Sequence, residues 1–136
     1  MDSVIPHLVI SDDDRDLRNS LGGLYTDRGF RTSLAADGIE ALEIATQVGV
    51  HLLLLDWHMP RMSGWDVYRQ LRRQKSQLPC ILMSGADASE VLGNTTDDAY
   101  FTFMHKPLNP RRLMEVTWAS LHRAYNWPVP PEVLAR

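Results

Sequence analysis

Short apolar runs alternate with amphipathic segments along nearly the whole chain. The runs predict β-strands, and between them apolar residues recur at the three- and four-residue spacing of helices that bury one face. The run at 51–55 is almost uniformly aliphatic, which is typical of a strand covered on both faces. This alternation predicts an α/β fold in which a parallel sheet lies between layers of helices. The predicted strands are residues 7–10, 30–34, 51–55, 80–83 and 102–104.

Capping residues mark where several of the helices begin. Asp37, Ser63 and Asn109 each stand directly before an amphipathic segment, and Pro110 suits the first turn of the last helix. A helix is also predicted over 87–98, although the Gly, Asn and Thr residues within it are poor helix formers.

Composition narrows the class of protein. A length of 136 residues suits one domain, and 44% apolar with 23% charged residues is typical of a globular protein. The formal charge of −3 provides no basic surface for nucleic acid or an anionic membrane. The single cysteine, Cys80, excludes an internal disulfide and fits a reducing compartment. The N-terminus has no secretory signal pattern and no apolar run is long enough to span a membrane, so we expect a cytoplasmic domain.

Polar side chains follow the predicted strands. Asp12 and Asp13 follow the first strand, Asp56 the third, Ser84 the fourth and Lys106 the fifth. We expect them to converge, because right-handed crossovers place all the carboxyl ends at one edge of the sheet. Converging carboxylates repel one another, and Mg²⁺ would relieve that repulsion, while a hydroxyl and an ammonium group complement a phosphoryl group. Since aspartate can form an aspartyl-phosphate, these residues predict Mg²⁺-assisted phosphoryl transfer onto a carboxylate.

The same positions carry a resemblance to a known family. The pair Asp12–Asp13, the segment 52–64 with its Asp-Trp-His-Met-Pro motif, the pair Ser84–Gly85 and the pair Lys106–Pro107 resemble the receiver domain of two-component response regulators, of the single-domain chemotaxis-regulator type. The resemblance covers about residues 4–125. It implies a flavodoxin-like three-layer sandwich of five helices and a five-stranded parallel sheet in the order 2-1-3-4-5.

The resemblance also implies a role for individual residues. Asp56 matches the phosphoacceptor, and Mg²⁺ is the implied cofactor. The implied metal-binding groups are Asp12 (mostly through water), Asp13, Asp56 and the backbone carbonyl of His58. The implied phosphoryl-binding groups are Ser84, Lys106 and the backbone N–H groups of Trp57 and Gly85. Ser84 and Phe103 match the switch positions of the family, and the Lys106–Pro107 bond is expected to be cis.

These features predict a phosphorylation-controlled switch. Asp56 would accept a phosphoryl group from a sensor histidine kinase or a histidine phosphotransfer protein, and the change would alter contacts with a downstream protein target. We expect a receiver domain over 1–125 and a proline-containing tail over 126–136, with no output domain. We also expect no nucleic-acid or membrane binding, a monomer or a weak phosphorylation-dependent dimer, and no enzymatic activity beyond its own phosphorylation and dephosphorylation.

Two alternatives fit parts of the pattern. A pseudo-receiver would dock to partners without being phosphorylated. An aspartate-nucleophile phosphatase of the haloacid dehalogenase type would use Asp12 and Asp14 as nucleophile and acid, with the acidic pair at 97–98 as metal ligands. That family places its acidic pair after the lysine, whereas here the pair precedes Lys106, and the motif around Asp56 would have no role. A flavodoxin is disfavoured because no Ser/Thr-rich phosphate loop follows the first strand.

Overall fold

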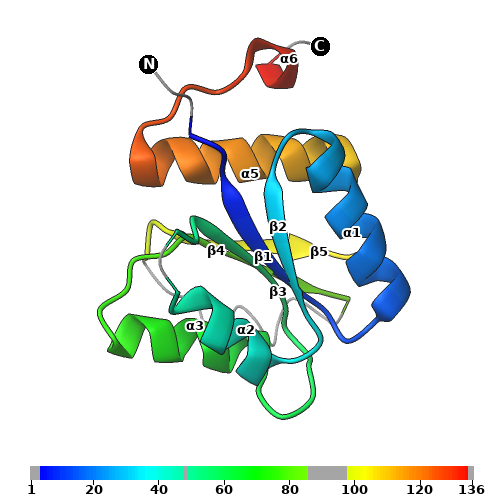
Figure 1. The fold of residues 1–136 in the computed structure, drawn as a ribbon, viewed down its shortest axis with the longest axis vertical. Helices are drawn as coiled ribbons and strands as arrows, with labels where there is room; N and C mark the ends of the chain where they lie inside the picture. Colours follow the sequence, from blue (N-terminus) through cyan, green and yellow to red (C-terminus); the bar gives the residue numbers. More distant parts are fainter. Residues whose placement is uncertain (1–3, 48, 86–97, 135–136) are drawn as a thin grey trace.

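The computed structural model describes residues 4–47, 49–85 and 98–134 and shows a three-layer α/β sandwich (Figure 1). Its strands are all parallel and pair in the order β2-β1-β3-β4-β5, as predicted. The order places β3 at the centre of the sheet, with β1 and β4 as its neighbours. The strands are β1 (His7–Ser11), β2 (Arg31–Ala35), β3 (Leu52–Asp56), β4 (Cys80–Ser84) and β5 (Phe101–His105).

The predicted caps begin three of the helices. The side chains of Asp37, Ser63 and Asn109 each accept a hydrogen bond from a backbone N–H in the first turn, at 3.0–3.1 Å. Asp14 caps the first helix in the same way. The predicted helix over 87–98 lies outside the described residues, except for Asp98. The described helices are α1 (Arg15–Asp27), α2 (Gly38–Ala45), α3 (Gly64–Arg73), α5 (Pro110–Tyr125) and the short α6 (Pro131–Leu134).

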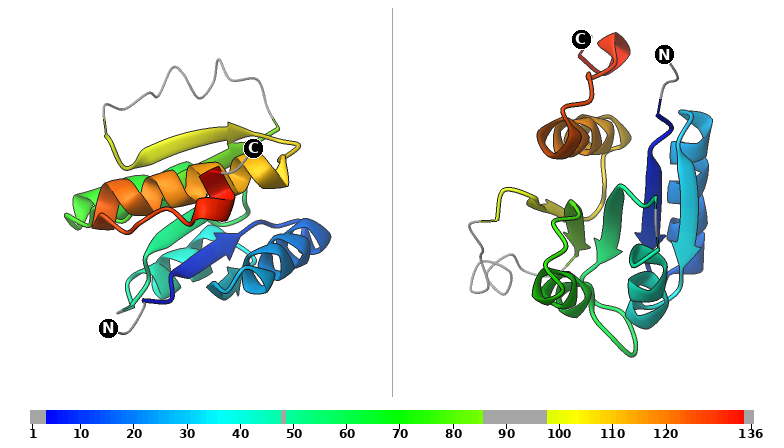
Figure 2. Two further views of the ribbon diagram at one scale, coloured as in Figure 1. Left: turned by 90° about the horizontal axis from the view of Figure 1, so that it is seen from above. Right: turned by 60° about the vertical axis from the view of Figure 1, so that its left-hand side comes forward.

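Alternating side chains of the strands form two apolar cores, one on each face of the sheet. Helices α2 and α3 cover one face, and α1 and α5 cover the other, as the two views of Figure 2 show. Val9, Leu53 and Leu82 belong to the core under α2 and α3, whereas Leu8 and Leu54 belong to the core under α1 and α5. Both layers therefore hold β3 rigidly, and its last residue is Asp56.

Strand ends differ from the predicted bounds by about one residue. Three strands continue to a polar residue that the sequence places in a loop, because Ser11, Asp56 and Ser84 still pair with the neighbouring strand. Strand β2 begins one residue later than predicted, because the Phe30 N–H donates to the Tyr25 carbonyl of α1 at 3.1 Å and the pairing with β1 begins at Arg31.

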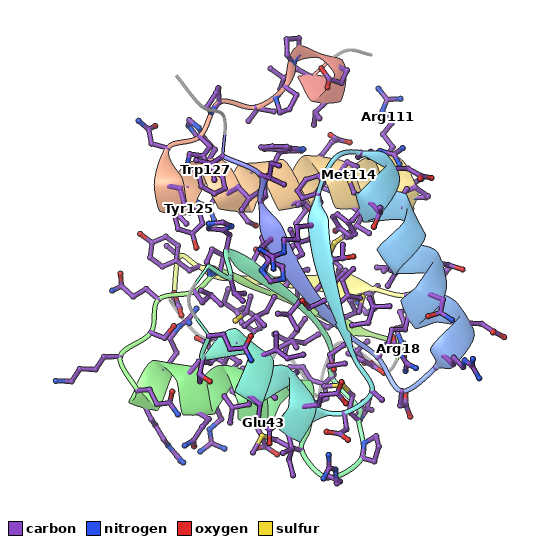
Figure 3. The ribbon with its side chains drawn as sticks, in the orientation of Figure 1. Arg18, Glu43, Arg111, Met114, Tyr125 and Trp127 are labelled. Atoms are coloured by element: carbon purple, nitrogen blue, oxygen red, sulfur yellow. The ribbon has the colours of Figure 1, made fainter. Side chains whose placement is uncertain are left out.

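The C-terminal segment packs back onto the domain. Trp127 stacks on Tyr125 at 4.7 Å between ring centroids and meets the His51 ring at 4.8 Å. Figure 3 shows both labelled residues at the same end of α5. The short helix α6 follows, which the proline-rich sequence did not predict. Within the described part of the chain, every helix is too short or too polar to cross a bilayer.

Candidate functional site

The carboxyl edge of the sheet gathers the predicted polar residues. Asp12 and Asp13 follow β1, Asp56 ends β3, Ser84 ends β4, and Lys106 follows β5. The neighbouring strands are in register at this edge, and the Lys106 N–H donates to the Ser84 carbonyl at 2.9 Å. The Lys106–Pro107 peptide bond is cis.

Three carboxylates meet here. One oxygen each from Asp12, Asp13 and Asp56 lies within 4.8 Å of the other two. Asp12 is fully buried, Asp56 is 5% exposed, and Asp13 is exposed, so the cluster opens to solvent on one side. A set of hard oxygen donors at this spacing fits Mg²⁺, which prefers carboxylate and carbonyl oxygens and keeps several waters. These residues therefore fit the implied cofactor.

Lys106 neutralises part of this acidic cluster. Its Nζ donates to Asp12 Oδ2 at 2.9 Å and lies 3.4 Å from Asp56 Oδ1. Burial opposes the charge of Lys106, but the hydrogen bond with Asp12 and the charges of both acids raise its pKa overall. The ammonium group consequently remains charged at neutral pH, where it can face an incoming phosphoryl group.

Asp56 is a weaker acid than an ordinary aspartate. Burial, followed by the negative charge of Asp12, raises its pKa to about 6, while Lys106 and the His58 N–H act in the opposite direction. At neutral pH the side chain is mostly ionised yet more basic than a solvated carboxylate. That combination suits a carboxylate nucleophile.

Asp12 and Asp14 are already engaged in structural hydrogen bonds. Asp12 Oδ1 accepts from the Asp14 N–H at 2.8 Å, and its Oδ2 accepts from Lys106. The Asp14 carboxylate caps α1 by accepting from the N–H groups of Asp16 and Leu17. These bonds weigh against the phosphatase alternative, which needs Asp12 as nucleophile and Asp14 as acid. The other acid of that alternative, Asp97, lies outside the described residues.

Two backbone N–H groups follow Asp56 directly. The Trp57 N–H, which is expected to bind a phosphoryl group, donates to the Met83 carbonyl at 2.7 Å. The His58 N–H is the group directed at the acid, 3.4 Å from Asp56 Oδ1. His58 is exposed to solvent. Gly85 is exposed at the end of β4, beside the buried Ser84.

The two switch positions lie on the same side of the sheet. Ser84 pairs with His105, and Phe103 pairs with Leu82, so the alternation of side chains places Ser84 and Phe103 on one face. Phe103 is half-buried against the core under α2 and α3 and meets the His105 ring at 4.8 Å.

Two residues that the sequence did not single out support the site. Arg18, labelled on α1 in Figure 3, donates from Nη1 to the Asp12 carbonyl at 2.7 Å. Gly64 lies against the Asp56 carbonyl, where a Cβ atom would come within 2.3 Å of the oxygen. The sequence gives no sign that Arg18, one of several charged residues on a predicted helix, would reach the Asp12 carbonyl. The glycine directly after the Ser63 cap is the one sequence feature that could have indicated how closely α3 approaches Asp56.

The fold and the site together define a flavodoxin-like α/β protein with an acidic, lysine-neutralised pocket at the carboxyl edge of its sheet. The response regulator receiver domain family matches residues 8–117. The chain therefore belongs to the response regulator receiver domain family. Receiver domains generally bind Mg²⁺ in an acidic pocket, and response regulators interact with histidine kinases and downstream targets.

Curated relatives are longer than this chain. Response regulator MprA of Mycobacterium leprae is 34% identical over 116 residues, which cover 85% of this chain and 51% of that protein. Response regulator RR06 of Streptococcus pneumoniae is 28% identical over 119 residues, covering 88% of this chain and 54% of that protein. The chain thus spans about half the length of the curated relatives it matches.

Solved receiver domains share the fold over nearly their whole length. The receiver domain of the Francisella response regulator 1452 has a TM-score of 0.76 and 26% identity, and the match covers 88% of this chain and 98% of that one. The chemotaxis protein CheY4 of Vibrio cholerae has a TM-score of 0.77 and 23% identity, and the match covers 85% of this chain and 98% of that one.

Proposed function

We propose that this chain is a phosphorylation-controlled switch whose phosphoacceptor is Asp56. The observation that carries the proposal is the convergence of three carboxylates on Asp56, with Lys106 reaching both Asp12 and Asp56. Asp56 is the candidate nucleophile because Asp12 is fully buried with both oxygens engaged and Asp13 has no lysine beside it among the described ion pairs.

The proposed reaction moves a phosphoryl group from a phosphohistidine to Asp56. A bond forms between an Asp56 carboxylate oxygen and phosphorus while the phosphorus–nitrogen bond of the donor breaks, and the leaving imidazole takes a proton from solvent. Mg²⁺, when held by Asp13, Asp56 and the His58 carbonyl, supplies electrostatic stabilisation of the phosphoryl oxygens. The proposed ligands of those oxygens are Lys106, the Ser84 hydroxyl and the backbone N–H groups of Trp57 and Gly85. The 3.4 Å contact of Lys106 with Asp56 supports the first of these, and the His58 N–H, which approaches the same carboxylate, is a further candidate.

The proposed donor is a histidine kinase or a histidine phosphotransfer protein. An apolar groove of about 700 Å³ runs between α1 and the loop after β5, and its lining includes Lys106 and Asp14. Leu17, Leu24 and Leu108 are among the residues that line it, so a donor with an apolar helical surface could rest there with its phosphohistidine directed at Asp56. This exchange fits the cytoplasm, where the single thiol of Cys80 stays reduced.

The proposed output is a change in contacts with a downstream protein. Ser84 moving toward a phosphoryl group on Asp56 would change the space available to Phe103, because the two share one face of the sheet. The face around β5 and α5 would then present a different surface to its partner. We propose a monomer or a weak phosphorylation-dependent dimer, with no contact to nucleic acid or membrane through this domain.

Incubation with acetyl phosphate and Mg²⁺, followed by intact-mass measurement, tests the proposal. We expect one phosphoryl adduct in the native protein, no adduct in Asp56→Asn, and a reduced but detectable adduct in Asp12→Asn. Steady release of phosphate that requires Asp12 and not Asp56 would support the phosphatase alternative. A native protein that forms no adduct would favour the pseudo-receiver.

A further inference from the structure

A column of aromatic rings leads away from the site along α3. Trp57, which follows Asp56 directly, stacks on Trp65 with 5.1 Å between ring centroids and 16° between ring planes. Trp65 in turn contacts Tyr68 at 5.2 Å and Phe101 at 5.9 Å, and those two rings lie 5.0 Å apart. The column therefore joins β3, α3 and β5 on one side of the sheet.

Charged groups hold the far end of this column. The Arg72 guanidinium lies 4.7 Å from the centre of the Tyr68 ring, and its Nε donates to Asp98. The Tyr68 hydroxyl donates to the same Asp98 oxygen at 2.9 Å, while the other oxygen accepts from the Tyr100 N–H at 2.8 Å. Arg72 and Asp98 are each about four-fifths buried, so the pair is shielded from the screening that weakens surface ion pairs.

At the near end of the column, backbone hydrogen bonds hold both the N–H and the carbonyl of Trp57, the residue that follows Asp56. The Trp57 N–H donates to Met83, its carbonyl accepts from the Gly64 N–H at 3.0 Å, and Gly64 lies against the Asp56 carbonyl. Trp57 separates Asp56 from His58, so a rotation of its peptide units would move the acid and the His58 carbonyl relative to each other. The Trp57 side chain is buried in the core under α2 and α3, and Trp65 stacks on its ring.

We propose that Trp65 is a positioning residue for phosphorylation of Asp56, acting through Trp57. The proposal rests on the proposed function of Asp56. Loss of the Trp65 ring opens space beside Trp57, which lets that residue reorient and loosens the alignment of Asp56 with the His58 backbone. Misplacement by about 1 Å of groups that surround a reacting atom can cost on the order of a hundred-fold in rate. Arg72 supports the same alignment from a distance, because it fixes the Tyr68 ring on which Trp65 packs.

Binding of Mg²⁺ and beryllofluoride, a mimic of the phosphoryl group, provides the test. Titration calorimetry gives the affinity, and we expect Trp65→Ala to weaken beryllofluoride binding by about ten-fold. We expect Trp65→Phe to restore most of the affinity, because a phenyl ring can still pack against the indole of Trp57. Trp118→Ala is the matched control, since Trp118 contacts Phe30 on the opposite face of the sheet. It should lower the free energy of unfolding and leave the affinity unchanged.

Substitutions at Arg72 and Arg73 test the far end of the aromatic column, at Tyr68, without removing an aromatic ring. Arg72→Gln removes the guanidinium from the Tyr68 ring and from Asp98, while the bond between Tyr68 and Asp98 is kept. We expect a loss of affinity of about three-fold, in the same direction as Trp65→Ala. Arg73→Gln changes the exposed next residue of the same helix and should have no effect. This pair keeps the proposal testable if Trp65→Ala does not fold.

Circular dichroism gives a readout independent of activity. Two stacked indoles produce an exciton couplet in the far ultraviolet, and we expect the native couplet to change on binding Mg²⁺ and beryllofluoride and to be absent in Trp65→Phe. Unchanged affinities in Trp65→Ala and Arg72→Gln, with native binding intact, would overturn the positioning role and leave the function of Asp56 standing. Native protein that binds no beryllofluoride would instead remove the proposed function.

Discussion

At neutral pH the ionised side chain of Asp56 destabilises the folded protein. Its folded pKa of about 6 lies above the ordinary value of 3.8, so the folded state holds this proton more tightly than the unfolded state does. The contribution of Asp56 to stability is therefore full below pH 4 and is lost as the pH rises through 6. At neutral pH the ionised Asp56 therefore destabilises the folded protein, first because it is buried and second because it lies near the negative charge of Asp12.

Replacing Asp56 with asparagine should stabilise the metal-free protein at neutral pH. We expect Asp56→Asn to raise the free energy of unfolding by about 1–3 kcal/mol at pH 7 and by much less at pH 4, because the amide carries no charge. Urea denaturation in the presence of a chelator measures the difference. Asp27→Asn, an exposed change at the end of α1, should stay within about 0.5 kcal/mol at both pH values. An Asp56→Asn protein that is less stable at pH 7 would contradict this view of the site.

Lys106 should set how far the pKa of Asp56 rises. We expect Lys106→Met to raise that pKa above 6, because the charge that opposes burial and Asp12 is removed. Carbon-13 chemical shifts of the Asp56 carboxyl, followed through a pH titration without metal, measure it. Lys75→Met is the matched control, because Lys75 is exposed beyond the end of α3. A pKa that stays near 6 in Lys106→Met would show that the Lys106 ammonium group, 3.4 Å from Asp56 Oδ1, does not lower the pKa of Asp56.

At the scale of elements, α3 packs against the end of β3 through a glycine. A Cβ on Gly64 would lie 2.3 Å from the Asp56 carbonyl oxygen. The Cβ is fixed directly to the backbone and its partner is a backbone oxygen, so neither can move aside easily. We expect Gly64→Ala to lower the free energy of unfolding by about 2–3 kcal/mol, as overpacking does. Gly23→Ala, at an exposed position of α1 with open space around it, should raise it by about 0.5–1 kcal/mol. Urea denaturation measures both changes in the free energy of unfolding. If the two substitutions changed it in the same direction, the close packing at Gly64 would be contradicted.

The elements show which features a sequence can predict. Local chemistry marked the Asp37, Ser63 and Asn109 caps, because a cap depends on residues one turn away. Strand ends were misplaced by a residue where a polar side chain continues the ladder, as at Asp56. The polar residues at the carboxyl edge were predictable because crossover handedness fixes where strand ends meet.

Features that depend on distant partners were not predictable from the sequence. The bond between Arg18 and the Asp12 carbonyl, the pairing of the Trp57 N–H with Met83, and the stacking of Trp57 on Trp65 depend on how whole elements pack. The packing of Trp127 onto Tyr125 belongs to the same group, since prolines say where a helix ends and not what the following residues contact.

For the whole molecule, one edge of the sheet is connected to one of its faces. Asp56 lies at the centre of the carboxyl edge, with an apolar groove beside Lys106, and the rings packed along α3 reach Phe101 on β5. We propose that the groove receives the donor protein and that β5 and α3 respond to phosphorylation. The central claim is that the phosphoryl group is attached to Asp56 and not to another acid of the cluster.

Chemical mapping of the phosphorylated residue tests that claim most directly. Protein treated with acetyl phosphate and Mg²⁺ is reduced with borohydride, which converts a phosphorylated aspartate into homoserine, and the peptides are sequenced by mass spectrometry. We expect homoserine at position 56 alone, and none when Mg²⁺ is replaced by a chelator. Homoserine at position 12 or 13, or at position 56 in equal amount without metal, would contradict that claim.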